Sequence, residues 1–194
     1  MERLPYEATV LSAAYDQVGR LPVRVVLHNI RSRYNVGAFF RSADGVSIDR
    51  IILSGFTGLP PHKEITKTAL GADQQVVWEP CQDAVTYVDA VRAVGHEVAA
   101  VETSRHAIDL FDWQPRFPVC LLFGHEVDGL DAELLGRCDV HVRLPMRGIK
   151  HSLNVATAGG VVLYELLRKY RALGVPEAMS PDPYFSTSDP VRSS

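Results

Sequence analysis

The sequence lacks the features of membrane and secreted proteins. It has no uninterrupted apolar run of about 18 residues, and no basic segment followed by an apolar run at its N-terminus. Its three cysteines, Cys81, Cys120 and Cys138, show no C-x-x-C spacing and lie in or beside apolar runs. They are interpreted as reduced packing residues, so neither disulfides nor a metal site is expected. These absences predict a soluble, cytoplasmic protein without a membrane partner.

The chain also has no excess of basic residues. Its formal net charge is −3 at pH 7, so any nucleic-acid site has to be a local basic patch on a nearly neutral body. Several catalytic signatures are missing as well: a G-x-G-x-x-G or G-x-x-x-x-G-K loop, a Ser-His-Asp order, and an obvious general-base histidine. This inventory suits a group transfer in which the reagent is already electrophilic.

Apolar segments alternate regularly between strand and helix patterns. The 194 residues, 46% of them hydrophobic, are enough for one domain. We predict a domain at 23–172, with a short N-terminal extension at 1–22, in which 11–18 could form helical turns, and a flexible tail at 173–194. Strands are predicted at 23–30, 50–56, 75–78, 97–101, 118–124 and 140–144, and helices at 35–46, 64–70, 83–94, 131–136 and 152–167. The alternation predicts an α/β fold with a mostly parallel sheet covered by helices on both faces.

The stretch from Arg143 to Leu167 is the one around which the rest is organised. A strand ends at Pro145, a basic turn with Arg147 and Lys150 follows, and a helix is expected to begin at Ser152 as its N-cap. Asn154 would lie inside the first helical turn. Such a strand–turn–helix mouth suits an anionic or strongly polar ligand, although an ordinary capped helix would show the same pattern.

Polar residues also follow other predicted strands, where ligands bind in open α/β sheets. After the first strand, Asn35 is expected to cap a helix, and three arginines form a basic cluster able to hold a phosphate: Arg31, Arg33 and Arg41. Gly124 and Glu126 follow the most apolar strand, and Thr103 follows another. Lys63 and Lys67 add basic groups near the second strand, where surface solubility explains them as well as RNA does.

Three motifs in order resemble those of the SpoU/TrmH family of RNA methyltransferases, in the SPOUT superfamily. They are Asn35-x-Gly-x-x-x-Arg41, Gly124-His-Glu126-x-x-Gly-Leu, and the segment from Leu144-Pro-Met146 through Ser152-Leu-Asn154. The resemblance covers about residues 23–170. It departs from the family at His125 and Val127, where many relatives have Asn and Gly. A valine restricted to ordinary φ values there raises the question of how the loop turns.

The resemblance implies a C-terminal trefoil knot, bound S-adenosylmethionine, a homodimer that completes the active site, and methylation of a ribose 2′-hydroxyl in tRNA or rRNA. By position, the cofactor would be held by Thr103, Gly124, Leu144, Met146, Ser152 and Leu153. Arg41 matches the family's catalytic arginine, with Asn35, Glu126, Ser152 and Asn154 around it. The RNA-binding residues would be Arg31, Arg33, Lys63, Lys67, Arg147 and Lys150.

Three alternatives remain beside this reading. The first is a non-catalytic RNA-binding dimer that keeps the SPOUT fold, which the near-neutral charge and the altered second motif favour. The second is an unrelated α/β nucleotide-binding enzyme, which the missing Gly-rich phosphate loop disfavours. The third is methylation of a base, from which the pair of Asn35 and Arg41 points away.

Overall fold

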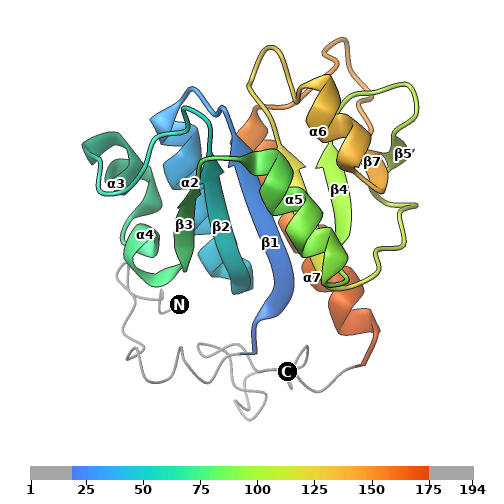
Figure 1. Cartoon of the computed structure of the whole chain (residues 1–194), viewed down its shortest axis with the longest axis horizontal. Coiled ribbons are helices and arrows are strands. Elements are labelled where there is room, and N and C mark those ends of the chain that lie inside the picture. Colours follow the sequence, from blue (N-terminus) through green and yellow to red (C-terminus); the bar gives the residue numbers. More distant parts are fainter. Residues whose placement is uncertain (1–18, 175–194) are drawn as a thin grey trace, which may run out of the picture.

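A parallel seven-stranded sheet forms the centre of the molecule in the computed structural model, which describes residues 19–174 (Figure 1). The strand order is β3-β2-β1-β6-β4-β7-β5, and every neighbouring pair is parallel. The strands are β1 (Leu21–His28), β2 (Ile48–Ser54), β3 (Trp78–Cys81), β4 (Glu97–Val101), β5 (Ile108–Asp109), β6 (Val119–Phe123) and β7 (Val140–Arg143). The predicted fold class, a mostly parallel sheet between helices, is confirmed.

Helices cover both faces of this sheet. In Figure 1, α5 (Ala84–Ala93) and α6 (Ala132–Arg137) lie in front of it, whereas α2 (Arg33–Val46) and α7 (Val155–Ala172) lie behind. Two short helices, α3 (Lys63–Ala69) and α4 (Ala72–Gln75), lie beside α2 near the β3 edge. The apolar side chains accordingly form two separate clusters, one on each face.

The central strands supply side chains to both clusters because successive residues of a strand point to opposite faces. In β6, Leu121 and Phe123 enter the α2/α7 cluster, while Cys120 and Leu122 enter the α5/α6 cluster. All are at most 1% exposed. Burial on both faces explains why β6 reads as an unbroken apolar run.

Helices α2 and α7 pack closely although they lie far apart in the sequence. A Cβ atom at Gly159 of α7 would overlap the ring of Phe39 on α2, so only glycine permits this approach. Phe39 in turn packs edge-on against Phe123 of β6, with the ring centroids 4.9 Å apart. This contact places the first part of α7 beside the middle of α2.

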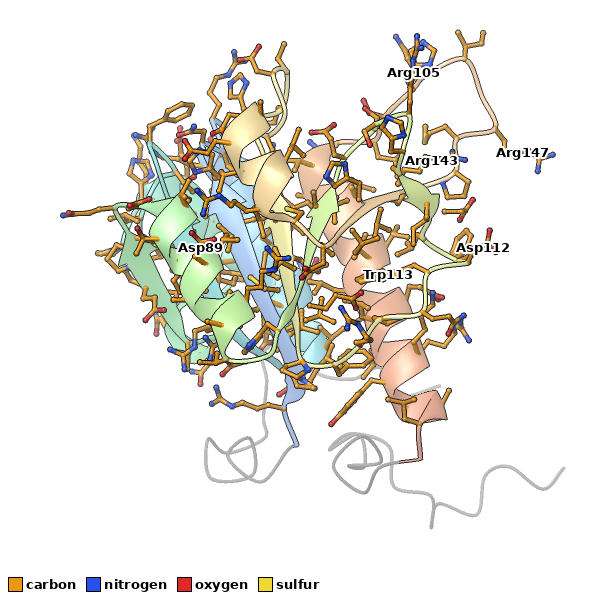
Figure 2. The ribbon with its side chains drawn as sticks, turned by 45° about the vertical axis from the view of Figure 1, so that its right-hand side comes forward. Asp89, Arg105, Asp112, Trp113, Arg143 and Arg147 are labelled. Carbon is orange, nitrogen blue, oxygen red and sulfur yellow. The ribbon has the colours of Figure 1, made fainter. Side chains whose placement is uncertain are left out.

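A buried lysine fastens α7 to the connection between β5 and β6. The Lys169 ammonium is 8% exposed and donates to the carbonyl oxygens of Leu110 at 2.7 Å, of Phe111 at 3.3 Å and of Trp113. The carboxylate of Glu165 lies 3.5 Å away. Figure 2 shows Trp113 beside α7. The contacts satisfy a charge that would be costly to bury alone.

The prediction of a strand at 75–78 is wrong. Residues Ala72–Gln75 form α4, and the strand follows at Trp78–Cys81. Val76 is buried in the α2/α7 cluster as the C-cap of α4, so the apolar pair of valines marks a helix end. The real strand contains Pro80, which is tolerated because β3 is an edge strand.

Most of the remaining element boundaries shift by a few residues, and the two-residue strand β5 was not predicted. The expected helical turns at 11–18 and the tail from 175 onward lie outside the described residues, and the trefoil knot stays a prediction. None of the helices between residues 19 and 174 is long and apolar enough to cross a membrane. Over the same residues, no group of three His, Cys, Asp or Glu side chains could hold a metal ion. The three cysteines are free.

Candidate functional site

Three loops meet at the C-terminal edge of the sheet, beyond β1, β6 and β7. Strands β1 and β6 are neighbours, yet the chain continues from β1 towards the β3 edge and reaches β6 from the opposite side. Such a reversal of strand order is where open α/β sheets bind ligands. The loops are 29–32 after β1, 124–131 after β6 and 144–154 after β7.

Glu126 joins the β6 loop to the beginning of α2. Its carboxylate accepts hydrogen bonds from the backbone amides of Arg31 at 2.9 Å and Ser32 at 3.0 Å, and from the Asn35 side-chain amide at 2.8 Å. Partial burial acts to raise the pKa of Glu126, but these hydrogen bonds outweigh it and hold the pKa below its ordinary value. Glu126 is therefore an ionised anchor for a helix N-terminus and a poor proton acceptor.

Asn35 also connects the β6 loop, through Asn154, to the beginning of α7. Its side-chain oxygen accepts from the Asn154 side-chain amide at 3.0 Å, and the Asn154 oxygen accepts from the backbone amides of Ala156 at 3.0 Å and Thr157 at 3.2 Å. Glu126, Asn35 and Asn154 thus form one chain of hydrogen bonds across three loops. Asn35 is thus bonded directly to residues that lie 91 and 119 positions away from it in the sequence.

Two predicted helix caps are corrected by these contacts. Asn154, and not Ser152, is the N-cap of α7, which begins at Val155. Ser32, and not Asn35, caps α2, which begins at Arg33. The displacement frees Ser152 and Leu153 from the helix, so both belong to the loop that lines the pocket.

Replacing Asn154 with alanine is expected to lower the free energy of unfolding by about 1–2 kcal/mol, because both the helix cap and the bond to Asn35 are lost. Ser152→Ala is the matched control and should change it by less than about 0.5 kcal/mol. Urea unfolding at neutral pH measures both. An equal loss in the two variants would contradict the assignment of the cap.

Glu126→Gln tests the anchor through its pH dependence. The folded-state pKa of Glu126 lies below the unfolded value, so its stabilisation is complete above about pH 5 and is lost as the pH falls through the folded pKa. The free energy of unfolding of wild type should exceed that of the variant by about 1 kcal/mol at pH 7, and this difference should disappear in acid. Urea unfolding from pH 3 to pH 7 would show this. Glu133→Gln, at an exposed carboxylate, should show a smaller gap at pH 7; a gap that persists in acid would refute the anchor.

A pocket of about 230 Å³ opens beside this network, at the ends of β4, β6 and β7. Val101 and Phe123 form part of its wall, together with the loop after β7. All six residues predicted to hold a cofactor line it: Thr103, Gly124, Leu144, Met146, Ser152 and Leu153. Glu126 and Asn154 line it too. Their roles stay predictions, but the structure places them together.

The loop that carries Glu126 turns without a glycine at position 127. Val127 has no positive φ; the left-handed residue is Gly129, with φ of 71°. His125 takes the part that an asparagine plays in such turns, since its Nδ1 atom accepts from the amides of Val127 at 3.4 Å and Asp128 at 3.1 Å. The departures at 125 and 127 are therefore accommodated within one tight turn.

Glu102 is a pocket residue that the sequence interpretation missed. Its carboxylate accepts from the backbone amide of Thr103 at 2.8 Å and from that of Leu130 at 3.3 Å, so it ties the end of β4 to the β6 loop. A Cβ atom at Gly129 would overlap it. Its position directly before Thr103, at the end of a predicted strand, was the available signal.

Arg41 does not reach the pocket of its own chain. It lies six residues beyond Asn35 on α2, which is about 9 Å along the helix axis. There it borders a separate hollow on the outer side of α2, α3 and α7, with Lys67, Leu70 and Tyr164. Three of the five predicted catalytic residues, Glu126, Ser152 and Asn154, therefore line the pocket. Asn35 hydrogen-bonds to two of them, Glu126 and Asn154, whereas Arg41 stands apart.

The predicted RNA-binding residues are all exposed and fall into two groups. Arg31, Arg33 and Lys63 lie at or just before the starts of α2 and α3, and Lys67 lies in the last turn of α3. The Lys67 ammonium is 5.8 Å from the centre of the Tyr34 ring. Arg147 and Lys150 lie on the loop after β7. Figure 2 shows Arg147 extending away from the ribbon. Whether they bind RNA stays a prediction.

Comparison with known proteins gives consistent matches. The chain is 30% identical over 177 residues to a 23S rRNA (uridine(2479)-2′-O)-methyltransferase of Streptomyces viridochromogenes, an alignment that covers 87% of this chain and 62% of that enzyme. Its fold matches the crystal structure of a TrmH/SpoU tRNA modifying enzyme from A. aeolicus with a TM-score of 0.76 and 23% identity, covering 85% and 83% of the two chains.

An AdoMet-bound rRNA methyltransferase from Sinorhizobium meliloti also matches, with a TM-score of 0.70 and 28% identity over 78% of this chain and 61% of that one. The chain thus spans less than two thirds of the S. viridochromogenes and S. meliloti enzymes. The SpoU rRNA Methylase family matches residues 22–164. Since that match spans well over half of its length, the chain belongs to this family.

Proposed function

We propose that this protein transfers a methyl group from S-adenosylmethionine to a ribose 2′-hydroxyl of tRNA or rRNA. The observation that carries the proposal is a pocket in which all six predicted cofactor residues meet beside Glu126 and Asn154. The family membership supports the same activity. Relatives named for rRNA and for tRNA both match, so both substrate classes are proposed.

The pocket suits an adenosine-bearing ligand. Residues 144–154 form neither helix nor strand, so their amides and carbonyls can face the pocket, where a purine edge needs both donors and acceptors. The side chains of Leu144 and Leu153, with that of Phe123 in the wall, offer apolar surface for the ring. The sulfonium of S-adenosylmethionine, when bound, supplies an electrophilic methyl group, so the protein's main task is to position the ribose.

Arg41 is proposed to act on the RNA in this reaction. Its guanidinium stays charged, so it is suited to hold the neighbouring phosphate and to stabilise the alkoxide that develops at the 2′-oxygen. When bound, S-adenosylmethionine would supply the methyl group that this oxygen takes up, with S-adenosylhomocysteine as the leaving group, and the hydroxyl proton would pass to the phosphate or to solvent. Glu126 is an unsuitable acceptor because its carboxylate already accepts three hydrogen bonds.

We also propose a homodimer that brings Arg41 to the pocket of the partner subunit. Arg41 borders a surface with two exposed apolar residues, Leu70 at 48% and Tyr164 at 54% exposure, which a second copy could cover. The free cysteines and the RNA substrates named for the family support a cytoplasmic site of action.

Calorimetric titration of the purified protein with S-adenosylmethionine, and with S-adenosylhomocysteine as a control, is the first experiment. One site per chain is expected, followed by 2′-O-methylation in a screen of unmodified tRNA and rRNA. A folded dimer that binds neither compound, with or without RNA, would refute the proposal and favour a non-catalytic RNA-binding dimer.

A further inference from the structure

An exposed aromatic ring stands next to the proposed active site without a role in the core. Phe56, in the loop between β2 and α3, is 62% exposed. One neighbour of its ring is the imidazole of His125, which meets it edge-on with the centroids 5.9 Å apart and an interplanar angle of 76°. His125 itself lines the pocket. The ring therefore lies at the rim of the site, open to solvent.

The backbone that carries Phe56 is firmly held. Its amide donates to the Asn29 side-chain oxygen at 3.1 Å, and Asn29 itself adopts a left-handed conformation with φ of 58°. The next residue, Thr57, is 5% exposed; its hydroxyl donates to the Leu27 carbonyl and accepts from the Ile30 amide, both at 2.9 Å. These hydrogen bonds fix the backbone at Phe56, so its large apolar side chain is held in a defined, exposed position. A surface residue without a function would not require such a fixed backbone.

Cations and a second aromatic ring continue from Phe56 along the surface. The stem of Arg33 packs against Gly58, two residues beyond Phe56. Tyr34 follows Arg33 and is 45% exposed, with the Lys67 ammonium near its ring. We call Phe56, Arg33, Tyr34 and Lys67 the aromatic–basic strip.

We propose that the aromatic–basic strip binds a single-stranded segment of the RNA substrate, with an unpaired base stacked on the Phe56 ring. Aromatic faces interleaved with cations are the features that bind unpaired nucleotides, since the rings stack bases and the cations meet phosphates. Because the chain as a whole carries a net charge of −3, RNA has to bind through a local group of cations. The strip is such a group, and we infer that RNA reaches the pocket along it. The choice of RNA as ligand rests on the proposed function.

The test compares Phe56→Ala and Phe56→Trp with the wild-type protein. Affinity is measured with a single-stranded oligonucleotide carrying one 2-aminopurine, whose fluorescence falls when the base stacks. Phe56→Ala is expected to weaken binding about tenfold or more and to abolish the quenching, whereas Phe56→Trp should retain both. Phe111→Ala is the matched control, because Phe111 is an aromatic residue of similar exposure (55%) after β5, and should bind as wild type does.

The outcomes separate this inference from the proposed function. S-Adenosylmethionine affinity should be unchanged in Phe56→Ala, since the ring lies outside the pocket lining. If wild type binds the oligonucleotide through Phe56 but binds no S-adenosylmethionine, the methyltransferase proposal fails and the strip stands. The strip is refuted if wild type does not bind the oligonucleotide or if Phe56→Ala binds it as wild type does. It is also refuted if Phe111→Ala loses as much affinity, or if Phe56→Ala dissociates the dimer in sedimentation, which would make the ring an interface residue.

Discussion

Arg41→Ala is expected to lower the turnover of methyl transfer at least about 100-fold, the scale of losing one preorganised group that stabilises developing negative charge. S-Adenosylmethionine affinity should stay within about twofold of wild type, because Arg41 is not part of the pocket lining of its own chain and is proposed to contact the RNA at the partner's pocket. Turnover is measured with a saturating RNA substrate, and affinity by calorimetry. The variant should fold normally, since the Arg41 side chain is exposed on α2.

Arg171→Ala provides the control, since Arg171 is also an exposed arginine on a helix but lies at the far end of α7. Its turnover should match wild type. Unchanged turnover in Arg41→Ala would remove Arg41 from the mechanism. The proposed dimer allows a further test. If each pocket uses the arginine of the partner subunit, an equimolar mixture of Arg41→Ala subunits and subunits whose pocket is blocked should recover part of the activity.

The second large effect is expected from Leu153→Glu, which supplies that pocket-blocked subunit. Leu153 lines the pocket and is 41% exposed, so a longer, charged side chain would enter the space proposed for adenine. Desolvating an unpaired carboxylate there costs several kcal/mol, so S-adenosylmethionine affinity should fall at least about 100-fold. Calorimetric titration measures the loss.

Leu173→Glu introduces the same charge at a residue of comparable exposure (60%), just after the end of α7. It should bind S-adenosylmethionine as wild type does. Normal affinity in Leu153→Glu itself would show that the cofactor lies elsewhere. Circular dichroism and unfolding of both variants verify that the fold is unchanged.

Much of the fold could be predicted because the buried strands carry continuous apolar runs. The predicted strand at 97–101 agrees with the observed β4 in both ends, and that at 118–124 contains β6. The error at 75–78 arose where two valines end a short helix and the true strand contains Pro80, so local pattern and tertiary pairing disagreed.

The members of the candidate site could be predicted from the resemblance to the family's motifs, but the hydrogen bonds between them could not. Sequence placed Glu126, Asn35 and Asn154 in one region, yet only the structure shows that they bond to one another in a chain. Glu102 and Phe56 were missed because their importance depends on the loops that they touch or border. A lone acidic or aromatic residue at a strand end carries no such signal.

The contact of Gly159 with Phe39 has a consequence for how the protein is made. Helix α2 is translated well before α7, and the ribosome must add more than a hundred residues between them. At about 5–20 residues per second this takes on the order of ten seconds, during which the side of α2 that α7 will cover has no permanent partner. The α2/α7 half can therefore form only once α7 has been made, and the closing contacts are among the most distant in the sequence, which slows the final step. Until α7 has been made, a nascent chain therefore exposes a helix face that the folded molecule covers.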